Sequence, residues 1–173
     1  MGMLDSTESR SWVQGQGGAP PWEVLPHPRS GQQCLRSRRP FVVGEILARF
    51  SAAATEDRPS RMTVQVSEHA HIALAPPSLS FMNHACEPNV HLDVEHRVAV
   101  AIASIVAGDE LTFFYPSTEW MMASPFDCHC GSPRCIGWIA GASQVPPSLL
   151  RGRPLAPHIA RLLGPAAGRV HVP

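Results

Sequence analysis

The sequence predicts a mostly β fold built from small sheets. Eighteen prolines and thirteen glycines among 173 residues argue against a helical bundle, because both residue types interrupt helices. Several short runs alternate apolar and polar residues, as half-buried strands do, and glycine or proline turns separate these runs. No G-x-G-x-x-G sequence follows a predicted strand, so a doubly wound dinucleotide-binding sheet is not expected.

The first 28 residues show no periodicity and contain a Gly-Gly-Ala-Pro-Pro stretch, so residues 1–28 are expected to form a flexible N-terminal arm. Two large aromatic residues, Trp12 and Trp22, are unusual in such a segment. They either pin the arm to the domain or belong to a substrate-facing surface, and burial of tryptophan favours pinning.

Three predicted strands follow in the first half of the chain. Residues 41–50 contain a Gly-Glu turn and then a short apolar strand. Residues 62–66 alternate apolar and polar side chains, which indicates a half-buried strand. Residues 71–74 form a weaker candidate that ends at two prolines.

Three more strands are predicted before residue 116. Residues 90–94 alternate cleanly, and residues 97–106 are rich in Val, Ile and Ala, as a buried strand is. A turn at residues 107–110 precedes a strand at residues 111–115. Residues 142–173 are expected to form a C-terminal extension with a short helix after Pro157.

The charge balance and the hydropathy pattern exclude several classes of protein. Fourteen arginines balance fourteen acidic residues, so no basic excess points to a nucleic-acid partner. No apolar run reaches the ~18 residues of a membrane-spanning helix, and the first residues do not resemble a signal peptide. We therefore expect a cytoplasmic protein without a membrane partner, whose five cysteines are metal ligands, catalytic thiols or core residues rather than disulfides.

Three cysteines lie close together in the sequence. Cys128, Cys130 and Cys135 have the spacing C-x-C-x4-C, in a loop that also contains glycine and proline. Zinc prefers four soft ligands, so a fourth ligand would come from Cys34, Cys86 or a histidine such as His129. The alternative is three buried thiols in the core, which the polar character of this loop disfavours.

A second group of polar residues occupies positions 83–89, with the sequence N-H-A-C-E-P-N. Such a density of short polar side chains indicates either a backbone held tightly around a site or an ordinary turn.

Taken together, these segments resemble the SET-domain family of S-adenosylmethionine-dependent methyltransferases. Residues 83–89 are similar to the family motif N-H-S-C-x-P-N, and residues 108–115 (G-D-E-L-T-F-F-Y) resemble G-E-E-L-T-F-D-Y. The three clustered cysteines match the family's post-SET C-x-C-x4-C sequence. The resemblance covers residues 29–141, with a SET domain at residues 29–118 and a post-SET zinc segment at residues 119–141. The arginine-only, Pro- and Ala-rich composition is typical of a bacterial member.

The resemblance implies a fold of small curved sheets with a pseudoknot, in which the two motif segments cross beneath the active site. It implies S-adenosylmethionine as cofactor and one structural zinc. Gln33 replaces the second glycine of the family's G-x-G opening, and would crowd the cofactor if its backbone had a positive φ. The roles that the resemblance assigns are the following: Tyr115 is catalytic; Gly31, Gln33, Asn83 and His84 bind the cofactor; Phe113 and Trp138 line the substrate channel; Cys86, Cys128, Cys130 and Cys135 bind zinc.

Three functions remain open from the sequence. The favoured one is methyl transfer to the lysine side chain of a protein. The second is transfer to a small amine or a carrier-bound metabolite, and the third is cofactor binding with altered chemistry.

Overall fold

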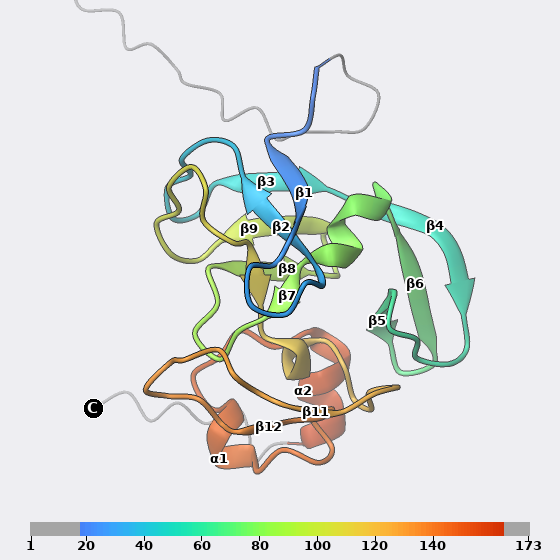
Figure 1. Ribbon diagram of the computed structural model, residues 1–173. Coiled ribbons are helices and arrows are strands. Elements are labelled where there is room, and N and C mark those ends of the chain that lie inside the picture. The colour runs from blue at the N-terminus through green and yellow to red at the C-terminus, as the bar shows by residue number, and fades with distance from the viewer. Residues whose placement is uncertain (1–17, 165–173) are drawn as a thin grey trace, which may run out of the picture.

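The computed structural model describes residues 18–164, which form several small sheets and two short α-helices (Figure 1). Two of the sheets have three antiparallel strands, in the orders β3-β9-β8 and β4-β6-β5. Their strands are β3 (Ile46–Arg49), β8 (Val90–Asp93), β9 (Val98–Ala101), β4 (Ser51–Glu56), β5 (Thr63–Ser67) and β6 (Ala70–Ala75). The two-stranded sheets pair β1 (Trp22–Pro26) with β2 (Gln33–Ser37), β7 (Asn83–His84) with β10 (Thr112–Phe113), and β11 (Phe126–Asp127) with β12 (Trp138–Ile139). The mostly β prediction is confirmed.

The prediction of a flexible arm through residue 28 is wrong for its last residues. β1 pairs antiparallel with β2, from Trp22 opposite Ser37 to Pro26 opposite Gln33. Trp22 is only 1% exposed, and its indole N–H donates a hydrogen bond to the Ser78 hydroxyl at 3.0 Å. Burial of this large side chain provides the free energy that orders the segment. Trp22 therefore pins the segment to the domain, whereas Trp12 lies outside the described residues.

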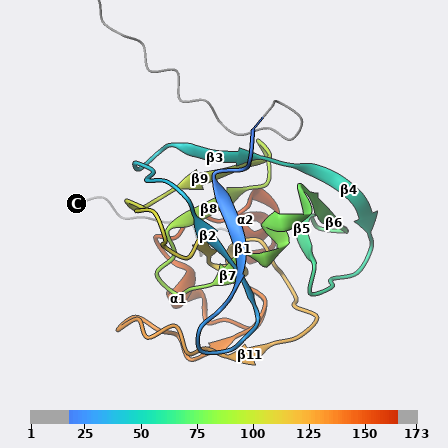
Figure 2. The same ribbon diagram turned by 45° about the horizontal axis from the view of Figure 1, so that its top comes forward.

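Most of the predicted strands are present, with shorter bounds. β9 covers only part of the predicted 97–106 segment, because the chain turns after Ala101 and returns as an isolated bridge between Phe41 and Ile105. β4 was not predicted. All six of its side chains are exposed, so its sequence carries no apolar alternation, and its strand conformation depends on pairing with β6. It lies at the outer edge of the molecule in both views (Figures 1 and 2).

The two motif segments lie side by side at the centre of the fold. β7 and β10 run parallel, with Asn83 opposite Thr112 and His84 opposite Phe113. The side chain of Asn89 fastens the same two segments together, because it donates to the Glu110 carbonyl at 2.9 Å and accepts from the Thr112 N–H at 2.9 Å. The two segments that the resemblance brings together are therefore neighbours in the fold.

The C-terminal extension packs beneath the segment that follows Tyr115. It contains α1 (Pro147–Leu150) and the predicted helix after Pro157, α2 (Pro157–Leu163). Two 3-10 turns complete the described elements, η1 (Pro77–Phe81) and η2 (Tyr115–Ser117). The Ala156 N–H donates to the Ser117 carbonyl at 2.8 Å, and the His158 ring lies 2.8 Å from the Thr118 carbonyl. These contacts hold the residues after Tyr115 against α2.

The chain also crosses itself at Gly141. A Cβ on Gly141 would fall on the carbonyl group of Trp120, so only glycine fits at this crossing. Directly after the contact, the Ala142 N–H donates to the Glu119 carbonyl at 2.7 Å and the Ser143 N–H donates to the Trp120 carbonyl at 3.1 Å. The post-SET segment therefore leaves the domain and returns to it at nearly one point.

Within residues 18–164, no helix has the length and apolar character required to cross a membrane.

Candidate active site

Tyr115, the only tyrosine in the chain, lies in an aromatic environment at the end of the central crossing. Its ring centroid is 4.7 Å from that of Phe113, 5.3 Å from that of His84 and 6.2 Å from that of Phe126. Its hydroxyl donates to the Met82 carbonyl at 3.2 Å. Burial raises the pKa of Tyr115 well above its usual value, and the nearby charge of Glu119 raises it further. The side chain is therefore a neutral phenol, with its proton directed at Met82.

His84 connects Tyr115 to the cysteines. Its Nδ1 accepts the backbone N–H of Tyr115 at 3.2 Å, and its Nε2 lies 3.3 Å from the Cys86 sulfur. Burial lowers the pKa of His84 to about 3, so the ring is neutral at physiological pH. Because Nδ1 accepts a hydrogen bond, the ring proton is on Nε2 and donates toward the sulfur.

The four cysteines that the resemblance assigned to zinc come together. The sulfurs of Cys86, Cys128, Cys130 and Cys135 all lie within 4.8 Å of one another, and all five cysteines of the chain are free. The Cys86 sulfur is 3.8 Å from that of Cys128 and 3.9 Å from that of Cys135, which is too far for a disulfide. Cys34 is buried in β2 outside this cluster. The structure thus selects Cys86, and not Cys34 or His129, as the fourth member.

The segments assigned to the cofactor also converge. The Asn83 amide donates to the Gln33 carbonyl at 3.3 Å, which places β7 against the start of β2. Gly31 has a φ of +69° in the loop between β1 and β2. Gln33 belongs to β2 and does not have a positive φ, so the predicted backbone strain at this position is absent. The main chain here is open to a ligand, since a Cβ on Gly31 would meet nothing within 4 Å.

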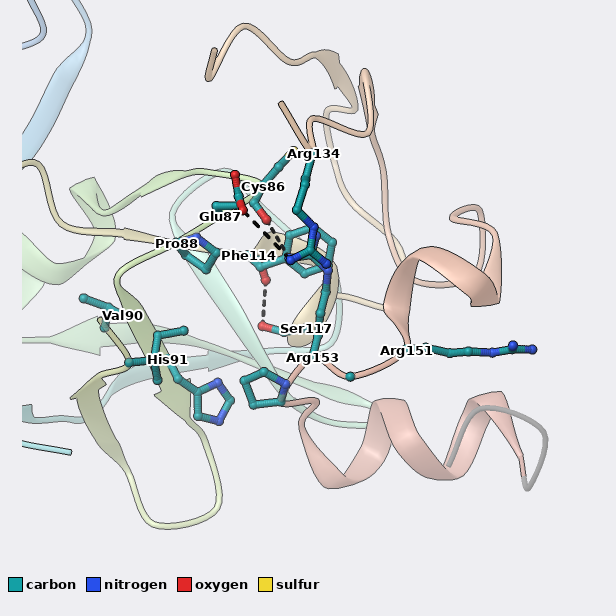
Figure 3. A pocket seen from close by; sticks show the side chains of 13 residues that line it. Cys86, Glu87, Pro88, Val90, His91, Phe114, Ser117, Arg134, Arg151 and Arg153 are labelled. Atoms are coloured by element: carbon teal, nitrogen blue, oxygen red, sulfur yellow. Dashed lines mark hydrogen bonds and ion pairs between the residues drawn. The ribbon is translucent and has the colours of Figure 1, made fainter. Parts of the chain in front are cut away.

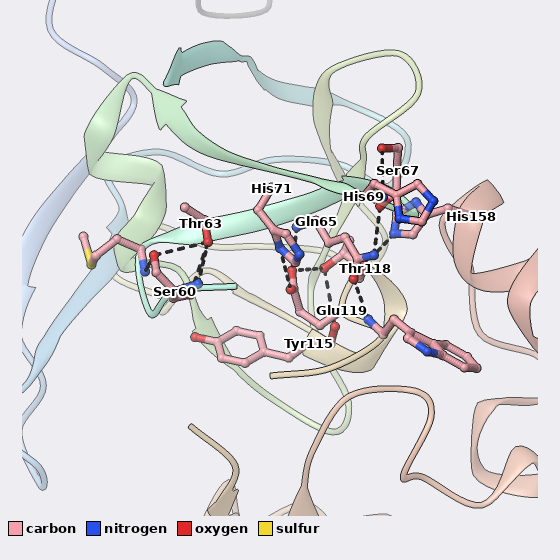
Figure 4. A network of polar contacts seen from close by, with 12 residues as sticks. Ser60, Thr63, Gln65, Ser67, His69, His71, Tyr115, Thr118, Glu119 and His158 are labelled. Carbon is pink, nitrogen blue, oxygen red and sulfur yellow. Dashed lines mark hydrogen bonds and ion pairs between the residues drawn. The ribbon is translucent and has the colours of Figure 1, made fainter. Parts of the chain in front are cut away.

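A buried polar network supports Tyr115 from behind (Figure 4). The Glu119 carboxylate accepts the Gln65 N–H at 2.9 Å and the Thr118 hydroxyl at 3.1 Å. In return, the Gln65 side-chain oxygen accepts the Trp120 N–H at 2.8 Å. The Tyr115 carbonyl accepts the N–H groups of Thr118 and Glu119, both at 3.1 Å. The network therefore fastens β5 to the turn that carries Tyr115.

Glu119 is expected to make stability depend on pH. Burial raises the pKa of its carboxyl to about 7, and burial also lowers the pKa of His71, whose Nδ1 lies 3.8 Å away. Between about pH 4.5 and 7 the folded protein keeps this proton and the unfolded chain releases it, so the contribution of Glu119 to stability falls as pH rises, whereas the lowered pKa values of His71 and His84 act in the opposite direction. The expected loss is on the order of 3 kcal/mol, and Glu119→Gln should abolish it. Denaturant unfolding at pH 5 and pH 8 measures the effect, with exposed Glu95→Gln as control. An unchanged pH dependence in Glu119→Gln would contradict the assignment.

A separate cavity of about 270 Å³ lies between residues 86–117 of the SET domain and residues 151–154 of the C-terminal extension, and Arg134 of the post-SET segment borders it (Figure 3). Its lining includes Cys86, Phe114 and Arg153, but not Tyr115. The Arg153 guanidinium donates to the Cys86 carbonyl at 2.6 Å and stacks on the Phe114 ring, 4.0 Å from its centroid. Phe114, which replaces the family's aspartate, is thus a core residue held beneath an arginine.

The predicted residues differ in how closely they approach Tyr115. Phe113 and His84 contact it, whereas Trp138 is 51% exposed on β12, and within the described part of the chain no ring contact joins it to Tyr115. The role of Trp138 in a channel stays a prediction. Sequence reasoning missed Phe126, although an aromatic residue two positions before Cys128 was a usable signal.

Comparison with known proteins gives the same family as the motifs. The family described as SET domain matches residues 11–116, more than half of the chain. Methyltransferase flvH of Aspergillus flavus is 34% identical over 157 residues, which cover 83% of this chain and 86% of that protein. The histone-lysine N-methyltransferase, H3 lysine-36 specific, of Debaryomyces hansenii is 37% identical, but over 40% of this chain and 10% of its own length.

Solved structures agree with the fold. The crystal structure of KRYPTONITE in complex with mCHG DNA and SAH has a TM-score of 0.53 and 21% sequence identity to this chain. The match covers 68% of this chain and 28% of that one. The sequence match, the paired motif segments and the shared fold lead to one conclusion: the chain belongs to the SET-domain family of methyltransferases.

Proposed function

We propose that this protein transfers a methyl group from S-adenosylmethionine to an amine nitrogen, and that its acceptor is the lysine side chain of a protein. The observation that carries the proposal is the position of the Tyr115 hydroxyl. It is fixed on the Met82 carbonyl, among the rings of Phe113, His84 and Phe126, and it follows β10, the strand that pairs with the one containing Asn83. An amine entering among these rings would meet one oriented hydroxyl and few other polar groups.

The residues around Tyr115 fit the demands of methyl transfer to an amine. The bound cofactor supplies an electrophilic methyl on sulfur: a new C–N bond forms as the C–S bond breaks, and the methylated ammonium then releases a proton. Burial of a lysine side chain away from water disfavours its charged form, whose ordinary pKa is about 10.4, and so promotes the neutral, reactive amine. Because the Tyr115 proton is engaged by Met82, the phenol oxygen keeps lone pairs that accept an amine N–H and orient the nitrogen.

We further propose one structural zinc ion on Cys86, Cys128, Cys130 and Cys135. A tetrahedron with Zn–S bonds of about 2.3 Å places its sulfurs about 3.8 Å apart. The Cys86 sulfur lies 3.8 Å from that of Cys128 and 3.9 Å from that of Cys135, and both separations fit that geometry. Burial raises the pKa of Cys86 to about 11, and a divalent cation would offset this by stabilising the thiolate. The N–H groups of Ile136 and His84 are directed at the Cys86 sulfur, as donors to a metal-bound thiolate are.

A small amine is the second candidate acceptor, and one observation favours it. The relative that this chain spans almost completely, flvH, is named only as a methyltransferase. The enzymes named as specific for H3 lysine 36 match less than half of this chain. Between β3 and Asn83 the chain contains only β4, β5, β6 and η1, which leaves little surface dedicated to a long peptide.

The acceptor can be identified with isotopically labelled S-adenosylmethionine. Purified protein is incubated with histones, with unmodified lysine peptides, and with free lysine and short alkyl diamines, and the products are analysed by mass spectrometry. Label on a lysine of a protein, lost in Tyr115→Phe, supports the first acceptor. Label only on the small amines supports the second. Cofactor binding without transfer to any of these amines would contradict both.

A further inference from the structure

Glu110 lies within the motif at residues 108–115, but the resemblance gave it no role. It precedes β10, and its carboxylate contacts two segments that are distant in the sequence. One carboxylate oxygen accepts the Asn83 side-chain N–H at 2.9 Å, and the other lies 3.4 Å from Nε2 of His27. The side chain is largely shielded, with 21% of its surface exposed. Glu110 thus joins the loop between β1 and β2 to strand β7.

His27 organises the loop that contains Gly31. Its Nδ1 accepts the N–H groups of Arg29 at 3.3 Å and Ser30 at 3.2 Å, and its carbonyl accepts the Gly31 N–H at 2.9 Å. Because Nδ1 is an acceptor, Nε2 carries a proton and donates toward Glu110. His27 therefore shapes the loop through one ring nitrogen and holds the carboxylate through the other.

The contacts of Asn83 define which way its amide faces. Its NH₂ group donates to both the Glu110 carboxylate and the Gln33 carbonyl, and both of these partners can only accept. A reversed amide would place its oxygen against the carboxylate, which would be repulsive. The Asn83 Oδ1 is consequently directed away from both partners, and it accepts no hydrogen bond from residues 18–164.

We propose that Glu110, held by His27, is a positioning residue that orients the Asn83 amide so that its oxygen accepts from the α-ammonium group of S-adenosylmethionine. The inference rests on the proposed function, since it takes Asn83 as a cofactor contact. The contact with Glu110 explains why the Asn83 side chain presents its oxygen, and not its NH₂ group, to the cofactor. A cationic amine requires an acceptor, and a freely flipping amide would present its NH₂ group half of the time.

Two substitutions separate orientation from folding. Glu110→Gln keeps the size of the side chain but offers an NH₂ group, so either orientation of Asn83 becomes acceptable. His27→Asn keeps an oxygen that can accept the Arg29 and Ser30 N–H groups, but it is too short to reach Glu110. The matched controls are Glu95→Gln and His69→Asn, which change the same residue types at exposed positions.

Calorimetry with two ligands provides the decisive readout. S-adenosylhomocysteine has the α-ammonium group, whereas 5′-methylthioadenosine lacks the whole amino-acid end. We expect Glu110→Gln to weaken S-adenosylhomocysteine binding by about twofold, because about half of the Asn83 amides then present the wrong group, and His27→Asn to weaken it by no more than this, with 5′-methylthioadenosine affinity unchanged. In Glu110→Gln/Asn83→Ala, binding should be no weaker than in Asn83→Ala alone, because Glu110 acts through Asn83. In turnover, the KM for the cofactor should rise by more than kcat falls.

Equal weakening of both ligands would overturn the proposal, because it would indicate a general structural role for Glu110. Full affinity for S-adenosylhomocysteine in Glu110→Gln, or additive losses in the double variant, would overturn it too. If Glu110→Gln does not fold, the same comparison in His27→Asn decides. A wild-type protein that binds neither ligand would contradict the proposed function itself, whereas wild-type binding with unaffected variants contradicts only the role of Glu110.

Discussion

Tyr115→Phe is expected to slow methyl transfer by at least about 100-fold, which is the lower range for loss of a positioned polar group at a reacting centre. The substitution removes the hydroxyl of Tyr115, whose ring packs with Phe113, His84 and Phe126. It leaves the ring in place, so the packing of Phe113 against it is preserved. The effect should fall on kcat and on kcat/KM alike, since the hydroxyl acts on the amine as it approaches the methyl group.

The experiment compares initial rates with S-adenosylhomocysteine affinity in the same preparation. Affinity should change by less than about threefold, because Asn83 and the Gly31 loop are untouched. Stability should decrease by about 1 kcal/mol, the usual contribution of one hydrogen bond such as that to Met82. Full activity in Tyr115→Phe would remove the catalytic assignment, and equal losses of rate and affinity would instead indicate a damaged cofactor site.

Removal of the metal is the second change expected to have a large effect. Purified protein should contain about one zinc per chain, and Cys128→Ser should lose it, because apparent structural zinc affinities of about 10–16 kcal/mol depend on all four thiolates. The four sulfurs lie within 4.8 Å of one another. Without the cation, these thiols would either stay protonated or, as thiolates, repel one another. The post-SET segment should then lose its order, and cofactor affinity should fall with it.

Cys34→Ala is the matched control, because Cys34 is a buried cysteine outside the cluster. It should retain zinc and cofactor binding. Metal analysis and calorimetry on the wild type, Cys128→Ser and Cys34→Ala distinguish loss of metal from loss of any cysteine. A folded, cofactor-binding wild-type protein that contains no zinc would end the proposal.

Sequence reasoning identified the residues that belong to local patterns. Two motifs, the C-x-C-x4-C spacing and the N-H-A-C-E-P-N run, each occupy a few neighbouring positions. Their roles could therefore be predicted without a structure. The choice among Cys34, Cys86 and His129 was open from residues alone. It depended on the pairing of β7 with β10 and on the path of the post-SET segment, neither of which leaves a mark at Cys86 itself.

Residues that act singly from distant segments were not predictable. His27 was assigned to a flexible arm, yet it contacts Glu110, which is far along the chain. Glu119 lies between the motif at residues 108–115 and the cysteine motif, and only the fold places Gln65 against its carboxylate. Strand β4 was missed for a different reason. Its run of alanine, serine and threonine has no buried face, so the sequence shows no alternation of apolar and polar residues. Its strand conformation depends on pairing with β6.

The crossing of Gly141 over Trp120 gives the post-SET segment the character of a tethered ring. Its two ends are already joined by backbone contact, so an ion that gathers Cys128, Cys130 and Cys135 closes only short internal loops, at a small entropic cost. The residues of the ring can also unfold locally as one cooperative unit, at a lower free energy than global unfolding. The backbone hydrogen bonds that join its two ends, from Ala142 to Glu119 and from Ser143 to Trp120, then stay in place. Because Ala142, Ala156 and His158 bond to the residues after Tyr115, these residues would keep their backbone contacts during such an opening, whereas Phe126, which lies in the ring, would leave the side chain of Tyr115.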